Sequence, residues 1–259
     1  MKTWRVAAAI AAVSVAAACS TDGTPTASDD VAPASNSAPS ASATGTSTPT
    51  ATTPQQATYA FTTTRIVGST DRVEYDVSIP QLTGGDDRVV AEFDESMRAA
   101  LQDQIDGFGD QRFTLSDARP GPTYIGPGVV SAVLDTSWDA NPPGAHPTYV
   151  IATVTVDTAT AQPVTLQDLF PDLQAGLQRL SEQSALLLPD TAAGPGFEPS
   201  GIAPTPNNFA NWTPSAGGMN IRFGDYQVGP HAIGLVDVTV PWSALADVAD
   251  PQVIDSLGG

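Results

Sequence analysis

Residues 20–57 set the first limit on what this chain can fold into, because they cannot supply a hydrophobic core. Nearly all of them are Ser, Thr, Ala, Pro, Gly or Asp, and Val31 is the only large aliphatic side chain. A segment of this composition is expected to be disordered, so the folded part begins near Tyr59. The roughly 200 residues that follow are enough to bury a core. The Ser/Thr/Pro composition also suits O-glycosylation.

The first nineteen residues have the pattern of a lipoprotein export signal. Lys2 and Arg5 precede an apolar run that ends at Ala18, and Cys19 follows directly. The run suits the apolar region of a signal peptide and is shorter than the roughly 20 residues of a spanning helix. We predict a signal peptide over residues 1–18 and a lipid on Cys19. The alternative is an ordinary secretory signal, which leaves Cys19 as a free thiol.

Lipidation of Cys19 predicts the location of the protein. The lipid would attach the chain to the cell membrane on its extracytoplasmic face. Residues 19–57, the lipidated cysteine and its linker, would then be a flexible tether with an average span of roughly 35 Å. Cys19 is the only cysteine. It therefore leaves the folded part without an internal disulfide.

The charge of the chain excludes one class of partner and favours another. The formal net charge is −18 at pH 7, and Lys2 is the only lysine. Such a chain is repelled by nucleic acid, so we predict no binding of DNA or RNA. Long-range attraction favours a cationic partner. The alternative is that the acidity only keeps an envelope protein in solution.

Hydrophobic periodicity predicts an α+β fold, a mixed or antiparallel sheet packed with two main helices. Alternating residues predict strands over 72–79, 129–138, 149–156, 219–223 and 233–240, the first ending at Pro80. Spacings of three and four residues predict one helix from Val90 to Ile105 and another from Leu173 to Leu188. The Pro- and Gly-rich residues 189–217 are expected to be irregular. We predict a small α+β subdomain over residues 58–125 and a second domain over residues 126–259.

Three segments of the second domain resemble a known family. They are Gly144-Ala-His-Pro147 with the strand after it, Pro163-Val-Thr-Leu-Gln-Asp-Leu-Phe170, and Met219 to Trp242. This ordered set is similar to a domain of formally unknown function. That domain forms the outer, lysozyme-sensing part of RsiV-type anti-sigma factors and occurs in some peptidoglycan deacetylases and secreted bacterial antigens. The family usually has Tyr where this chain has His231 and Trp242. The resemblance implies a compact α+β ectodomain over residues 126–259, with lysozyme as one kind of partner and no single activity.

The sequence contains no complete set of residues for a known chemistry. His146 and His231 are the only histidines, and Ser215 lies outside any G-x-S-x-G motif. The histidines lack zinc-site spacing, and Asp135 and Asp139 lack that of a calcium loop, so we attribute these acids to solvated loops. No glycine-rich phosphate loop occurs. We predict no catalytic residue, no metal ligand and no cofactor.

Four side chains are candidates for contact with a ligand. They are His146, Trp138, Trp212 and Tyr226. Aromatic rings can stack on the faces of sugars, whereas the alternative is ordinary packing, and His146 can instead cap a turn. The predicted function is a non-catalytic, lipid-anchored ectodomain of the cell envelope that binds a protein or cell-wall ligand, such as lysozyme or peptidoglycan. The alternatives are a weak serine esterase and a structural envelope lipoprotein.

Overall fold

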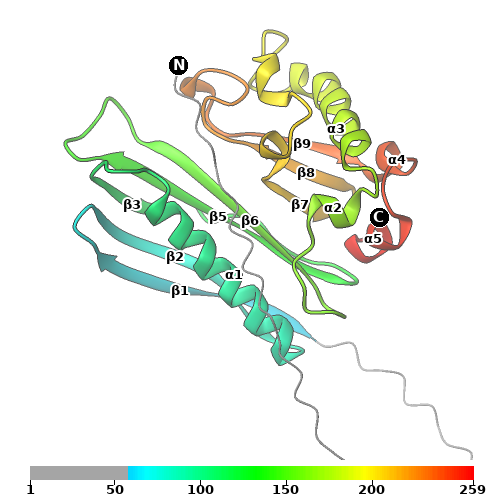
Figure 1. Cartoon of the computed structure of the whole chain (residues 1–259), viewed down its shortest axis with the longest axis horizontal. Coiled ribbons are helices and arrows are strands. Elements are labelled where there is room, and N and C mark those ends of the chain that lie inside the picture. Colours follow the sequence, from blue (N-terminus) through cyan, green and yellow to red (C-terminus); the bar gives the residue numbers. More distant parts are fainter. Residues whose placement is uncertain (1–57) are drawn as a thin grey trace, which may run out of the picture. The chain divides into compact units, whose positions relative to one another are not determined.

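The computed structural model describes residues 58–259, and the α+β fold predicted from the sequence is confirmed there (Figure 1). This part contains nine strands in two sheets and five α-helices. No helix within it is long and apolar enough to cross a membrane. The predicted signal peptide, Cys19 and the linker lie outside the described residues and remain predictions.

The larger sheet has six strands and is mixed. The long strand β5 pairs with β6 along one edge and with β3 and β4, one after the other, along its other edge. Strand β2 continues the sheet through a parallel pairing with β3, and β1 forms the far edge. The strands are β1 (Tyr59–Ser69), β2 (Val73–Gly84), β3 (Phe113–Asp117), β4 (Thr123–Ile125), β5 (Val129–Ala140) and β6 (Thr148–Asp157).

Helix α1 (Asp87–Asp106) covers one face of this sheet. Asp86 caps its start by accepting a hydrogen bond from the Arg88 backbone N–H. The predicted apolar stripe is present, except that Val89 rather than Val90 is the fully buried residue of the first turn. The helix contributes to one hydrophobic core the side chains of Val89, Phe93, Met97, Leu101 and Ile105.

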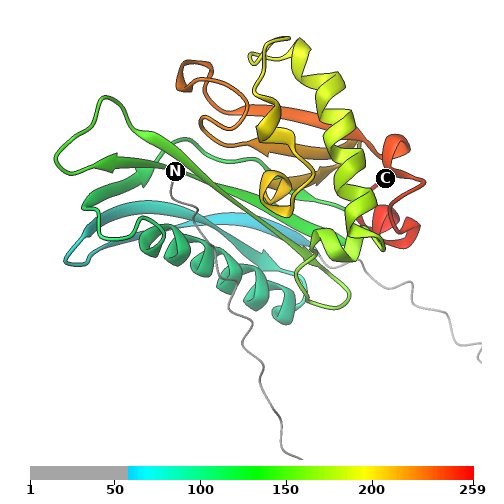
Figure 2. The same cartoon turned by 45° about the horizontal axis from the view of Figure 1, so that its top comes forward.

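A second, three-stranded antiparallel sheet lies on the opposite side of the larger sheet (Figure 2). Neighbouring residues of β5 show this arrangement, because successive side chains of a strand point to opposite faces. Thr136 donates to Gln104 of α1, whereas Asp135 accepts from Arg222 of the second sheet. The sheet consists of β7 (Trp212–Ser215), β8 (Gly218–Phe223) and β9 (Val236–Pro241).

The second sheet has its own helices and its own hydrophobic core. Helix α3 (Leu173–Leu187) packs against β9 and buries Leu177, Leu180 and Ser184 of the predicted stripe. The shorter helices are α2 (Leu166–Leu169), α4 (Trp242–Leu245) and α5 (Pro251–Leu257). Short 3₁₀ helices cover Leu188–Asp190, Pro199–Ile202, Pro206–Phe209 and His231–Ile233.

Three predicted boundaries were wrong. Strand β2 runs through Pro80 to Gly84. The proline is tolerated because the N–H groups of Ser78 and Leu82 point to the side where no strand pairs with β2, and the Pro80 nitrogen shares that side. The stretch 189–217 contains 3₁₀ turns and strand β7. Strand β9 starts at Val236, since residues 231–233 form a 3₁₀ turn.

The larger sheet extends across the predicted boundary at residues 125 and 126. Strands β1 to β3 come from the first predicted domain, whereas β5 and β6 come from the second. Strand β5 contributes to both cores: Val130, Ala132 and Leu134 pack with α1, and Val129 packs with the second sheet. The division into two domains stays a prediction about this chain.

Candidate functional site

Four rings from two loops and one strand meet at the surface; we call them the ring cluster. His146 lies between β5 and β6, Tyr149 lies on β6, and Tyr226 and His231 lie between β8 and β9. The two imidazoles stack with centroids 3.7 Å apart and planes 13° apart. The ring centroid of Tyr226 lies 6.0 Å from that of His146, and the ring centroid of Tyr149 lies 6.1 Å from that of His231. The cluster therefore brings together segments that are distant in the sequence.

Hydrogen bonds orient both imidazoles. His146 Nδ1 lies 3.0 Å from the Pro147 carbonyl oxygen, and its Nε2 lies 2.9 Å from Tyr226 Oη. In the neutral tautomer with the proton on Nδ1, the ring donates to Pro147 and accepts from Tyr226. His231 Nδ1 lies 2.7 Å from Asp225 Oδ2. The Asp225 side chain is only 1% exposed, and its Oδ1 has no hydrogen-bond partner.

The loop between β8 and β9 is held in an uncommon backbone conformation. Tyr226 has a φ of 62°, in the left-handed region that few residues other than glycine adopt. Gln227 fixes the loop on both sides of this residue. Its side-chain oxygen accepts from Gly224 N, and its amide donates to the carbonyls of Gly201 and Asn208. The loop is therefore anchored to the segment before β7. This anchoring holds the loop in the conformation that exposes Tyr226.

The ring cluster offers contact surface rather than an assembled nucleophile. The Tyr226 side chain is 55% exposed and that of Tyr149 is 36% exposed. Exposed aromatic rings contribute to interfaces through their faces and their polar ends. The Ser215 hydroxyl donates to Gly218 O, and no hydrogen bond within residues 58–259 joins it to His146 or His231.

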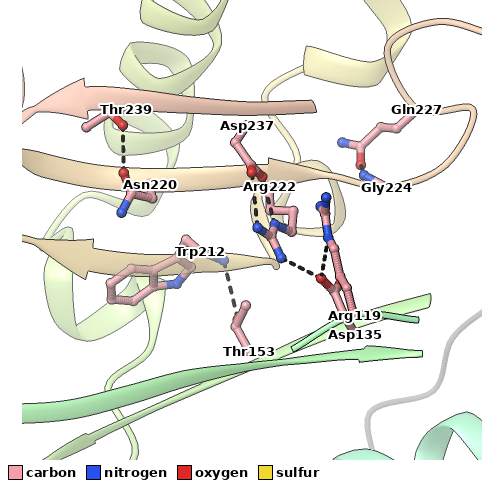
Figure 3. Close-up of polar contacts among 10 residues, drawn as sticks. All are labelled: Arg119, Asp135, Thr153, Trp212, Asn220, Arg222, Gly224, Gln227, Asp237 and Thr239. Carbon is pink, nitrogen blue, oxygen red and sulfur yellow. Dashed lines mark hydrogen bonds and ion pairs between the residues drawn. The ribbon is translucent and has the colours of Figure 1, made fainter. Parts of the chain in front are cut away.

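The other two predicted contact residues lie elsewhere. Trp138 is partly buried against the core that includes α1, with its ring stacked on Phe108 at a centroid distance of 5.1 Å. Trp212 is 5% exposed within the second core, and its backbone N–H donates to Thr153 Oγ1 (Figure 3). The structure thus brings together His146 and Tyr226 but neither tryptophan. His231 was not among the predicted contact residues, and the signal missed was its place in the same resembling segment as Tyr226.

An ion network around the buried Asp135 links the two sheets. Asp135 Oδ2 accepts from Arg222 Nη1 at 2.8 Å and from Arg119 Nε at 3.2 Å (Figure 3). Arg222 also donates to both oxygens of Asp237, at 2.7 and 3.0 Å. The attribution of Asp135 to a solvated loop was wrong: it lies within β5, where a strand was predicted over residues 129–138, and it is only 4% exposed. A carboxylate is buried there because two guanidinium groups pair with it.

At Arg222, burial and the neighbouring charges of this network shift the pKa of the guanidinium in opposite directions. Burial alone acts to lower the pKa of the guanidinium, because it disfavours the charged form. The hydrogen bonds to Asp237 and the charges of Asp237 and Asp135 outweigh it, so the pKa of Arg222 is raised. Arg222 therefore stays charged. Within residues 58–259, no group of three ligating side chains could hold a metal ion.

Together, the fold and the ring cluster define an α+β domain with a surface site built on loops. A family model described as "Protein of unknown function (DUF3298)" matches residues 167–243. The matched segment includes Tyr226 and His231 and excludes His146 and Tyr149.

Two solved structures resemble the chain at low identity. One is a member of the DUF3298 family from Bacteroides fragilis, with 14% identity and a TM-score of 0.48, covering 78% of this chain and 98% of that one. The other is a DUF3298 family protein from Pseudomonas aeruginosa, with 14% identity and a TM-score of 0.45, covering 76% of this chain and 95% of that one. No curated protein matches the sequence.

Proposed function

We propose that this chain is a lipid-anchored ectodomain of the cell envelope that binds a cationic protein, such as lysozyme, through the ring cluster. The observation that carries the proposal is the convergence of four rings, two of them well-exposed tyrosines, at one surface. Tyrosine is enriched among the residues that dominate binding energy at protein interfaces.

The charge of the folded part favours a cationic partner over a neutral one. Residues 58–259 hold 25 acidic side chains and 8 arginines. This excess would steer a basic protein toward the domain and raise its rate of association. At the surface, Lys or Arg side chains of the partner can lie over tyrosine faces, an interaction worth about 0.5–2 kcal/mol each. The resemblance to RsiV-type ectodomains agrees with this choice of partner.

The test is calorimetric titration of the chain with lysozyme and, separately, with soluble peptidoglycan fragments. We expect saturable binding of lysozyme that weakens about tenfold or more in Tyr226→Ala and His146→Ala. Leu186→Ala is the matched control, because this exposed side chain lies on α3 outside the cluster. Binding of peptidoglycan fragments without binding of lysozyme would identify a cell-wall glycan, and not a protein, as the ligand of the ring cluster. Binding of neither would favour a structural envelope lipoprotein.

The lipid anchor is a separate part of the proposal. Its support is the order of Lys2, Arg5, the apolar run and a single cysteine at position 19. Cells grown with a radioactive fatty acid should label the wild-type chain and leave Cys19→Ala unlabelled. Equal labelling of both would reject the anchor, and an unlabelled wild type would favour the ordinary secretory signal.

A weak esterase is the second candidate, and the Asp225–His231 pair favours it. A buried carboxylate that orients an imidazole is an arrangement that activates a nucleophile in hydrolases. Hydrolysis of a short-chain ester should then be lost in His231→Ala and in Asp225→Asn. Activity that persists in both variants would remove these residues from any catalytic role.

A further inference from the structure

A pocket lies where the larger sheet is interrupted between β3 and β4. It is separate from the ring cluster. Strand β3 ends at Asp117 and β4 begins at Thr123, so the chain leaves the sheet between them. Among residues 58–259, no strand fills the space between the end of β2 and the middle of β5. A pocket of about 440 Å³ occupies this place. Its size falls within the range of small-molecule sites.

The loop of residues 118–122 that forms one wall is held firmly. Ala118 N donates to Asp135 O, and Val133 N donates to Pro122 O, so both ends of the loop are bonded to β5. Gly121 lies so close to β5 that an added Cβ would collide with the Val133 carbonyl oxygen. A pre-formed wall of this kind lowers the entropy lost when a ligand binds.

Two side chains of opposite charge, Asp117 at the end of β3 and Arg119 in the loop, line the pocket and are not paired with each other. Asp117 Oδ1 accepts from Ser78 N at 2.7 Å. Arg119 is held through its Nε by Asp135 (Figure 3). No ion pair joins Asp117 to Arg119 within residues 58–259. Asp117 Oδ2 and the two terminal nitrogens of Arg119 therefore remain available to a ligand.

The surroundings add hydroxyl groups and little further charge. Thr63, Ser78 and Thr123 line the pocket, and their hydroxyls make no hydrogen bond within the described part of the chain. Arg65 and Asp76, on the adjoining strands, form an ion pair with each other. Asp135 also lines the pocket, but its carboxylate is bonded to Arg119 and Arg222. The groups left for a ligand are therefore the Asp117 carboxylate, the Arg119 guanidinium and several hydroxyls.

From these observations we propose that the pocket binds a short zwitterionic peptide, with its carboxylate at Arg119 and its ammonium at Asp117. A guanidinium presents parallel N–H groups that match a carboxylate. Two residues of extended chain span at most about 7 Å, and the ends of a dipeptide are separated by a similar length. The Cα atoms of Asp117 and Arg119 lie within the same span, so their side chains can reach the two ends of a ligand of about dipeptide length. The site is independent of the proposed function of the ring cluster.

The experiment titrates the full chain, in detergent, with L-alanyl-L-alanine and with two blocked forms of it. The N-acetyl form lacks the ammonium, and the amide form lacks the carboxylate. We expect saturable binding of the free dipeptide and about tenfold or weaker binding of each blocked form, because each loses a charge-assisted contact. No saturable binding of the dipeptide, or equal binding of all three, would overturn the proposal. Weakening by only one blocking group would overturn its zwitterionic part.

Two variants and one control connect binding to the named residues. Arg119→Gln and Asp117→Asn should each weaken binding of the free dipeptide about tenfold. The Asn can still accept from Ser78 N, so this variant should fold, and thermal melting checks both. Arg88→Gln is the control, since this exposed arginine pairs with Asp86 at the start of α1. Undiminished binding by both folded variants would show that the dipeptide binds elsewhere. Unchanged lysozyme binding by them separates this site from the ring cluster.

Discussion

Tyr226 Oη lies 2.9 Å from His146 Nε2, although 80 residues separate them in the sequence. This hydrogen bond joins the loop after β5 to the loop after β8, beside the stacked imidazoles of His146 and His231. The surface proposed to bind a ligand therefore exists only while both loops are in contact. Its integrity depends on a few exposed interactions rather than on the cores.

Replacing His146 should loosen the two loops without unfolding the protein. We expect His146→Ala to lower the free energy of unfolding by less than about 1.5 kcal/mol, the typical range for one hydrogen bond. Amide hydrogen exchange should nevertheless rise in residues 141–148 and 225–234, because the stack and the bond to Tyr226 are lost. Mass spectrometry of exchanged peptides measures this. Unchanged exchange in residues 225–234 would show that the loop after β8 does not depend on its contact with His146.

Breaking the ion network between the sheets should be far more costly. Arg222→Gln leaves the buried Asp135 with Arg119 as its only charged partner, so we expect a loss of about 3 kcal/mol of stability. The control is Arg65→Gln, since the Arg65 side chain is 68% exposed and such ion pairs contribute less than about 1 kcal/mol. Urea denaturation compares the two variants. Equal losses of unfolding free energy in the two variants would show that the burial of Asp135 does not increase the cost of removing its arginine partner.

Acid should weaken the contact between α3 and the segment after α4. The hydrogen bond from Arg179 holds the pKa of Asp247 below its usual value. A carboxyl whose pKa is lower in the folded state stabilises the protein above about pH 4 and loses this contribution as the pH falls further. The difference in melting temperature between wild type and Asp247→Asn should therefore shrink from pH 7 to about pH 3. A constant difference would count against this linkage.

The loop of residues 118–122, which forms one wall of the pocket beside β5, should not tolerate a larger residue at position 121. Gly121→Ala places a methyl group against the Val133 backbone oxygen, so we expect a loss of about 1–3 kcal/mol. Gly196→Ala is a matched control, because an added Cβ there meets nothing within 4 Å. Thermal melting of both variants measures the effect, and an equal change would indicate that the loop can move away from β5.

Much of the fold was predictable because its signals are local. The alternation along residues 129–138 and 149–156 predicted β5 and β6, and the helical spacing predicted the buried faces of α1 and α3. Pro80 misled the prediction for β2, since the effect of a proline depends on which side of the strand its missing donor faces. That side is set by where β3 ends, which no local pattern contains.

The candidate site was only half predictable. His146 and Tyr226 were chosen as contact residues, and they do meet. Trp138 and Trp212 have the same aromatic character, yet both pack against core residues. Aromatic type does not distinguish a core ring from an exposed one, because the difference depends on which segments pack against it. Asp135 was misjudged for the same reason, since its two arginine partners come from separate segments.

By itself, the sequence determined the fold class, the approximate positions of α1, α3, β5 and β6, and the composition of residues 20–57, because periodicity and composition are properties of adjacent residues. The prediction of a lipid at Cys19 also rests on the sequence alone. Tertiary structure decided which rings meet, which carboxylate is buried and where the sheet opens into a pocket. The contact between Tyr226 and His146 depends on two loops held by separate sheets, so it arises only when those sheets pack together.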